Sequence, residues 1–122
     1  MSRTVLANAT FYVGESLAPA TGSLVVEHGL ITELGDGVVT RPDDLVIDLG
    51  GGFVVPGLMD AHCHLIYRDV ADPYDIELRK SLPEATIDAV YNAEVLLKKG
   101  FTTIRDVGSR GNIGVEVRNA VG

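Results

Sequence analysis

The feature that most constrains the architecture is the segment Val54–Leu65, whose sequence is VVPGLMDAHCHL. Together with Phe53 it begins as a nearly continuous apolar run, which is expected of a strand that is buried on both faces. Pro56 and Gly57 interrupt regular pairing, so we expect this strand to kink or to start late. The segment ends in two histidines and therefore carries candidate ligands at the end of a buried strand.

A helix and a second strand are expected downstream. The helix is predicted at about Leu82–Lys99, because Ser81 and Glu84 have capping-box spacing and apolar residues recur at the helical period. Phe101–Val107 has the composition of a strand, and a further helix is predicted at Ile113–Val121. The strand–helix–strand order predicts a βαβ unit with parallel strands, and so an α/β fold.

The residues before this segment form short candidate strands separated by tight turns. Two β-rich runs meet at His28–Gly29, a two-residue link that favours a hairpin because glycine adopts positive φ at little cost. Another strand is expected at Leu45–Leu49, and Gly50–Gly52 then breaks the pattern. We therefore predict a small β-sandwich-like domain at residues 1–52 and an α/β part at residues 53–122.

Composition excludes several classes of protein. The chain has 122 residues, 46% of them apolar, and a formal net charge of -7. The surplus of acidic residues argues against nucleic-acid binding, which needs clustered Lys and Arg. Cys63 is the single cysteine, so no internal disulfide is possible, which fits a reducing compartment. No long apolar run indicates a signal peptide or a membrane span, so a cytoplasmic protein with no membrane partner is expected.

The chemical signal lies in the sequence Asp60-Ala61-His62-Cys63-His64. In an extended chain, residues two apart point to the same side, so the rings of His62 and His64 are expected to aim at one point, as two ligands of one metal ion require. Asp60 lies on that side too. Imidazole suits several transition metals, and histidine with carboxylate most often indicates zinc.

Two parts of the sequence resemble the amidohydrolase superfamily. Val54–Leu65 resembles its opening signature, and residues 100–108, GFTTIRDVG, resemble its second barrel strand, especially in the peptidase-like branch of prolidase-type and carboxypeptidase-like enzymes. The β-rich start resembles the small β-domain that accompanies the barrel. The resemblance implies a TIM-like (β/α)8 barrel with one or two divalent metal ions, most often zinc, and His62 and His64 match the ligands from the first strand.

The function implied by the resemblance is hydrolysis of an amide-type C–N bond by metal-activated water. The peptidase-like branch suggests a small-molecule amide as substrate, such as a dipeptide or an N-acyl amino acid, and a homo-oligomer when the enzyme is complete. A non-catalytic scaffold or assembly protein that keeps the amidohydrolase fold is the alternative. A free-standing metal-binding module is disfavoured, because half a parallel sheet has exposed edges.

The barrel is expected to be incomplete in this chain. Such a barrel needs about 250 residues, and the chain accounts for roughly two of its eight strand–helix units. The resemblance assigns the other catalytic groups to later strands: a bridging carboxylated lysine or glutamate, two more histidines and an aspartate that shuttles protons. We therefore expect the chain to need a remaining barrel segment or a second chain, and to be inactive and unstable as an isolated monomer.

Three polar residues near or before the histidines have alternative interpretations. Asp60 is either a partner or water contact of the metal site or a buried carboxylate that caps the strand end. Cys63 alternates away from the histidines, toward the expected helix layer, which favours a packed, inert thiol. His28 is most simply an exposed turn residue.

Two further groups follow the expected strand ends. Tyr67, Arg68 and Asp69 lie where substrate would sit, although loops at that edge are usually polar anyway. Arg105 and Asp106 adjoin the end of the second strand. They either line the site or form a structural ion pair with the loops, and we favour the ion pair.

Overall fold

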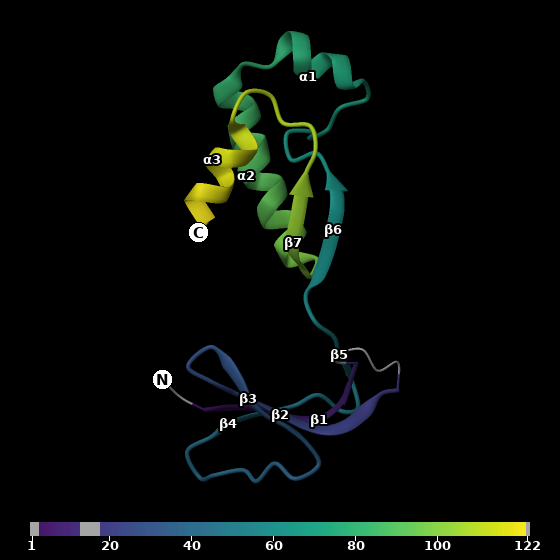
Figure 1. Ribbon diagram of the computed structural model, residues 1–122, viewed down its shortest axis with the longest axis vertical. Coiled ribbons are helices and arrows are strands. Elements are labelled where there is room, and N and C mark those ends of the chain that lie inside the picture. The colour runs from purple at the N-terminus through teal and green to yellow at the C-terminus, as the bar shows by residue number, and fades with distance from the viewer. Residues whose placement is uncertain (1–2, 13–17, 122) are drawn as a thin grey trace. The chain divides into compact units, whose positions relative to one another are not determined.

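The computed structural model describes residues 3–12 and 18–121. The chain divides into two compact units, Met1–Pro56 and Gly57–Gly122. Figure 1 shows the first unit as a sheet and the second as two strands with helices. None of the described helices is long and apolar enough to cross a membrane.

The first unit consists, within the described residues, of one mixed sheet of five strands. Its central strand β1 pairs antiparallel with β2 and parallel with β4 and β5, and β3 lies outside β2. The strands are β1 (Thr4–Phe11), β2 (Ala20–Glu27), β3 (Leu30–Gly35), β4 (Leu45–Asp48) and β5 (Phe53–Val54). The expected sandwich-like unit is therefore a single sheet here, because β1 pairs with every other strand except β3.

The hairpin predicted at His28–Gly29 is confirmed. β2 and β3 pair antiparallel, and both linking residues have positive φ, 53° for His28 and 78° for Gly29. That conformation at both central positions matches the right-handed twist of the flanking strands. The side chain of His28 is exposed, as expected of a turn residue.

The predicted boundary at residue 52 is wrong, because the first unit continues to Pro56. Phe53 and Val54 form β5 and pair with Thr10 and Phe11 of β1, so they belong to the first unit. The glycines Gly50–Gly52 do not end the unit. They lie beside a register shift in the pairing of β1 with β2. There Asn8 has φ 53° and its carbonyl accepts a hydrogen bond from the Gly51 amide at 2.6 Å.

The second unit contains the predicted βαβ arrangement. β6 (Leu58–Cys63) and β7 (Phe101–Asp106) pair in parallel, and the chain between them forms α1 (Pro73–Arg79) and α2 (Leu82–Lys98). α3 (Ile113–Val121) follows β7, as predicted. The apolar run Phe53–Met59 is thus divided between two sheets, because Val55, Pro56 and Gly57 lie in neither strand.

The capping box predicted at the start of α2 is present. The Ser81 hydroxyl accepts a hydrogen bond from the Glu84 amide at 3.3 Å, and the Glu84 carboxylate accepts one from the Ser81 amide at 3.4 Å. These contacts satisfy two backbone N–H groups that would otherwise lack partners at a helix start.

The core of the second unit lies on the helix side of the two strands. Six buried residues form it: Leu65, Ile66, Ala85, Ala89, Ile113 and Val117. By contrast, Leu58 and Met59 of β6 are 44% and 75% exposed. Adjacent strand residues point to opposite faces, so the expectation that this strand is buried on both faces is wrong at Leu58 and Met59.

Candidate metal centre

His62 and His64 lie together at the carboxyl end of β6. His62 is the penultimate residue of the strand. His64 directly follows its last residue, Cys63. Their ring centroids are 5.4 Å apart, with 64° between the ring planes. The two imidazoles therefore share one side of the strand, as the alternation of side chains predicts.

The ring of His64 contacts an aromatic side chain over its face and a glycine at its edge. It stacks on Tyr67 with 4.6 Å between centroids and 7° between planes. On Gly108, a Cβ atom would lie 2.3 Å from Nδ1 of His64, so only glycine leaves room for the ring there. Tyr67 is close in sequence, whereas Gly108 comes from the loop after β7.

One nitrogen of His64 lacks a partner. Its Nδ1 is buried and makes no hydrogen bond to any of the described residues. A buried polar atom without a partner costs free energy. His64 lies beside a second histidine. Its unpartnered nitrogen therefore fits a metal site whose set of ligands is completed by further groups.

The histidine pair fits part of a metal site rather than a whole one. Structural and catalytic zinc sites use at least three protein donors of the His, Cys, Asp and Glu types. No group of three or more such side chains able to hold a metal occurs within residues 3–12 and 18–121. His62 and His64 are thus suited to supply two donors, and metal binding by them stays a prediction.

Asp60 contacts the backbone of the neighbouring histidine. Its Oδ1 accepts a hydrogen bond from the His62 amide at 3.0 Å. Of the two alternatives considered for Asp60, this contact favours capping of the strand end. The same hydrogen bond holds the main chain that carries the His62 ring, so Asp60 affects the histidine through its backbone.

Cys63 faces the opposite side, as expected, and packs against the core of the second unit. Burial raises the pKa of its thiol, and the nearby carboxylates of Asp106 and Asp60 raise this pKa further. A thiol with a raised pKa is protonated at neutral pH and is a poor ligand and nucleophile. The geometry agrees with a packed, inert thiol.

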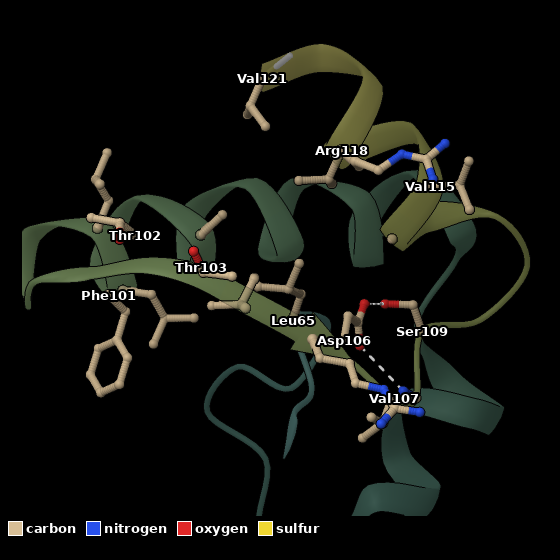
Figure 2. Close-up of a pocket in the computed structure, with 18 of the residues that line it drawn as sticks. Leu65, Phe101, Thr102, Thr103, Asp106, Val107, Ser109, Val115, Arg118 and Val121 are labelled. Atoms are coloured by element: carbon tan, nitrogen blue, oxygen red, sulfur yellow. Dashed lines mark hydrogen bonds between the residues drawn. The ribbon is translucent and has the colours of Figure 1, made fainter. Parts of the chain in front are cut away.

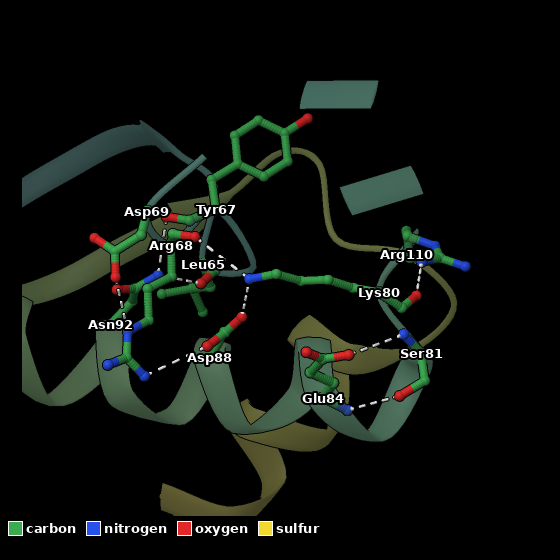
Figure 3. A network of polar contacts seen from close by, with 10 residues as sticks. All are labelled: Leu65, Tyr67, Arg68, Asp69, Lys80, Ser81, Glu84, Asp88, Asn92 and Arg110. Atoms are coloured by element: carbon green, nitrogen blue, oxygen red, sulfur yellow. Dashed lines mark hydrogen bonds and ion pairs between the residues drawn. The ribbon is translucent and has the colours of Figure 1, made fainter. Parts of the chain in front are cut away.

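Arg68 turns toward Asp88 of α2 (Figure 3). Its guanidinium lies 3.8 Å from the centroid of the Tyr91 ring and 3.5 Å from Asp88. Lys80 also forms an ion pair with Asp88, which is only 7% exposed. Arg68 therefore fastens the loop after β6 to the helix, while its neighbour Asp69 is exposed and pairs with it at 3.6 Å.

Asp106 organises the loop that follows β7. Its carboxylate accepts hydrogen bonds from the Ser109 hydroxyl and, at 3.2 Å, from the Gly108 amide. Figure 2 shows the contact between Asp106 and Ser109. Within the described residues, hydrogen bonds thus take the place of the ion pair favoured for Asp106, and Arg105 is exposed.

An apolar groove of about 960 Å³ lies between β7, α2 and α3 (Figure 2). Leu65, Ile104 and Val117 are among the residues that line it, and neither His62 nor His64 contributes. The groove therefore adjoins the candidate metal centre at Gly108 but is not lined by its histidines.

Three contacts near His64 were not predicted from the sequence. They are the close approach of Gly108, the hydrogen bonds from Asn92 to the turn after β6, and the stacking of Tyr67. Tyr67 stands out in the sequence as a loop residue, but nothing in its spacing indicated a ring contact with His64. The roles of Gly108 and Asn92 depend on segments that meet only in the folded unit. An aromatic residue three positions after a ligand histidine is a signal that could have suggested the stack.

Comparison with known proteins supports the fold. The chain is 42% identical over 96 residues to the dihydroorotase of Trichlorobacter lovleyi, a match that covers 75% of this chain and 20% of that protein. The crystal structure of a Xaa-Pro dipeptidase with bound methionine matches with a TM-score of 0.81 and 30% identity over 98% of this chain and 30% of the other.

A further solved structure, described as an amidohydrolase, matches with a TM-score of 0.76 and 26% identity, over 98% of this chain and 29% of the other. No family model matches the sequence. The chain thus spans 20% to 30% of the length of these proteins. With this likeness over nearly its whole described length, the chain belongs to the amidohydrolase superfamily, in which prolidase-like enzymes are among its structural neighbours.

Proposed function

We propose that this chain is a segment of a metal-dependent hydrolase that cleaves an amide-type C–N bond. The observation that carries the proposal is the pair of imidazoles at the carboxyl end of β6, with 5.4 Å between the centroids of His62 and His64. In barrels of this class, active sites lie at the carboxyl ends of the strands. The buried Nδ1 of His64, which has no hydrogen-bond partner among residues 3–12 and 18–121, supports a site that further groups complete.

Zinc is the metal that we propose for this site. Amidohydrolase relatives generally use divalent metal ions, and imidazole is a good zinc ligand. His62 and His64 would hold the ion, which when bound supplies a nucleophilic water at neutral pH. Tyr67 and the backbone at Gly108 restrict the His64 ring, and Asp60 restrains the backbone of His62.

The substrate we propose is a dipeptide or an N-acyl amino acid. The match with a TM-score of 0.81 is to a structure described as a Xaa-Pro dipeptidase, and another neighbour is described as a prolidase complexed with N-methylphosphonate-L-proline. Dihydroorotase, the relative with 42% identity, is likewise a hydrolase of a C–N bond. Imidazoles that hold a metal ion cannot also protonate the leaving nitrogen, so we propose that another group does so.

We propose that activity requires the rest of the barrel, supplied by further chain or by a second polypeptide, and that the complete enzyme is a homo-oligomer. Two parallel strands leave backbone groups unpaired at their edges. Leu58 and Met59, which are 44% and 75% exposed, are also suited to pack against that remainder. We call the chain together with this remainder the assembled protein.

The test compares His62→Ala and His64→Ala with His28→Asn in the assembled protein. His28 is the third histidine of the chain, is exposed in a hairpin, and asparagine tolerates its positive φ. We expect both alanine variants to lose bound zinc and dipeptide hydrolysis together, while His28→Asn keeps both. The readouts are metal content after dialysis and turnover of a dipeptide panel.

Two results would count against the proposal. Unchanged metal content in both alanine variants would exclude these histidines as ligands. Metal binding by the wild-type protein without turnover of any amide would favour the non-catalytic scaffold instead.

A further inference from the structure

Asn92, in the middle of α2, fastens the turn that follows the histidines. Its side-chain Nδ2 donates one hydrogen bond to the carbonyl of Leu65 at 2.7 Å and another to the carbonyl of Tyr67 at 3.1 Å. Figure 3 shows Asn92 beneath this turn, beside Arg68 and Asp88. An amide nitrogen carries two protons, so one side chain satisfies two main-chain carbonyls.

The turn held by Asn92 carries the ring that stacks on His64. Leu65 and Ile66 are 3% and 0% exposed, so the turn is anchored in the core. Directly after them, Tyr67 stacks on the His64 ring, and its amide donates a hydrogen bond to the His64 carbonyl at 3.2 Å. Asn92 is therefore linked to His64 through one residue, Tyr67.

Backbone also restricts the Nδ1 edge of the His64 ring. The Gly108 position leaves no room for a Cβ, which would lie 2.3 Å from Nδ1. The Val107 amide donates a hydrogen bond to the Cys63 carbonyl at 3.0 Å, which fixes this loop beside the histidine. Gly108 thus limits the ring at this edge, whereas Tyr67 is the contact that stacks on its face.

We propose that Asn92 is a positioning residue for His64: by holding the carbonyls of Leu65 and Tyr67, it sets the stack that selects the orientation of the His64 ring. The inference rests on the proposed function for its consequence, which is metal affinity. Its structural step, the dependence of the stack on Asn92, stands apart from metal binding. Groups that orient a metal ligand typically change metal affinity by about 10–100-fold when removed.

The experiment uses Asn92→Asp, Asn92→Ala and Tyr67→Ala in the assembled protein. Aspartate has nearly the shape of asparagine but no N–H donors, and it turns oxygen atoms toward two carbonyls. Asn119→Asp is the matched control, because it makes the same chemical change at an exposed position of α3. Thermal unfolding and far-ultraviolet circular dichroism identify variants that are folded.

The first readout is the NMR signal of the His64 ring protons in metal-free protein. A ring stacked on tyrosine gives signals shifted by the aromatic ring current. We expect Asn92→Asp and Asn92→Ala to lose this shift, as Tyr67→Ala does, while Asn119→Asp keeps it. A His64 signal unchanged in folded Asn92 variants overturns the inference.

The second readout is zinc affinity, measured by competition with a chelator of known affinity. We expect both Asn92 variants to bind zinc about 10-fold or more weakly, with Asn119→Asp unchanged. If the wild-type protein binds no zinc, the proposed function fails, while the ring-current result still decides whether Asn92 sets the stack. Wild-type affinity in folded Asn92 variants overturns the positioning role.

Discussion

At the scale of single residues, the surroundings of His64 are the most specific feature of the molecule. Its ring stacks on Tyr67, the Gly108 backbone lies close to its Nδ1 edge, and its Nδ1 is buried. A ring confined in this way loses little further conformational freedom when it binds a ligand. The confinement depends on the absence of a side chain at Gly108, which makes that glycine a sensitive position.

We expect Gly108→Ala to weaken metal binding in the assembled protein by roughly tenfold or more. The added Cβ would lie 2.3 Å from Nδ1 and 2.6 Å from Cε1 of His64, so the ring must move. Gly37→Ala is the control, since nothing lies within 4 Å of its Cβ position. Competition with a chelator gives both affinities. Equal affinities in Gly108→Ala and Gly37→Ala would contradict the role assigned to the close approach.

At the scale of secondary-structure elements, α2 organises the second unit. One face packs Ala85 and Ala89 into the core. Its polar residues Asp88 and Asn92 fasten the loop after β6, which carries Arg68 and Tyr67. The helix therefore supports the candidate metal centre without contributing a ligand, and its polar residues link the fold to the site.

We expect Asp88→Ala to lower the free energy of unfolding by on the order of 2 kcal/mol, because it removes the mostly buried carboxylate that Lys80 and Arg68 share. The cost stays moderate since the side chains of Lys80 and Arg68 are 21% and 36% exposed and regain some solvent. Glu94→Gln on the same helix is the control. It removes an exposed ion pair with Lys98 and should change stability little.

Urea denaturation of the assembled protein measures both variants. Similar midpoints for Asp88→Ala and Glu94→Gln would mean that the buried position of Asp88 brings no extra stability. A larger loss in Asp88→Ala would also predict faster proteolysis of the loop after β6, because Arg68 and Lys80 no longer meet on one carboxylate.

At the scale of the whole molecule, the second unit exposes many large apolar side chains. Leu58 and Met59 of β6 are 44% and 75% exposed, and Ile87 and Val90 of α2 are 66% and 54% exposed. Large apolar side chains in water are unfavourable, and the two-stranded parallel sheet also leaves backbone groups unpaired at its edges. Both features fit the proposal that a polypeptide partner completes this unit.

We therefore expect residues 1–122 purified alone to self-associate, to lack a cooperative thermal transition and to hydrolyse no dipeptide. Addition of the polypeptide that completes the barrel should restore order and turnover. Sedimentation, thermal unfolding and metal-dependent hydrolysis measure the three properties. A monomer with a cooperative transition and metal-dependent turnover would mean that the chain is sufficient by itself.

Local patterns predicted much of the second unit. The capping residues Ser81 and Glu84, the helical period of α2 and the strand composition of β7 act over a few neighbouring residues, so they can be recognised in the sequence. The shared side of His62 and His64 follows from the alternation of an extended chain. The amino-acid sequence by itself therefore determines the fold class and the histidine pair.

The boundary between the units and the setting of His64 are decided only by the tertiary structure. Phe53 and Val54 look like the start of the buried strand, yet they pair with β1, because an irregular stretch at Asn8 lets one strand edge accept both β4 and β5. Gly108 and Asn92 meet the histidine region from distant parts of the chain. Strand partners and ring contacts of this kind depend on which distant segments compete for the same surface, and short-range sequence patterns carry no information about that competition.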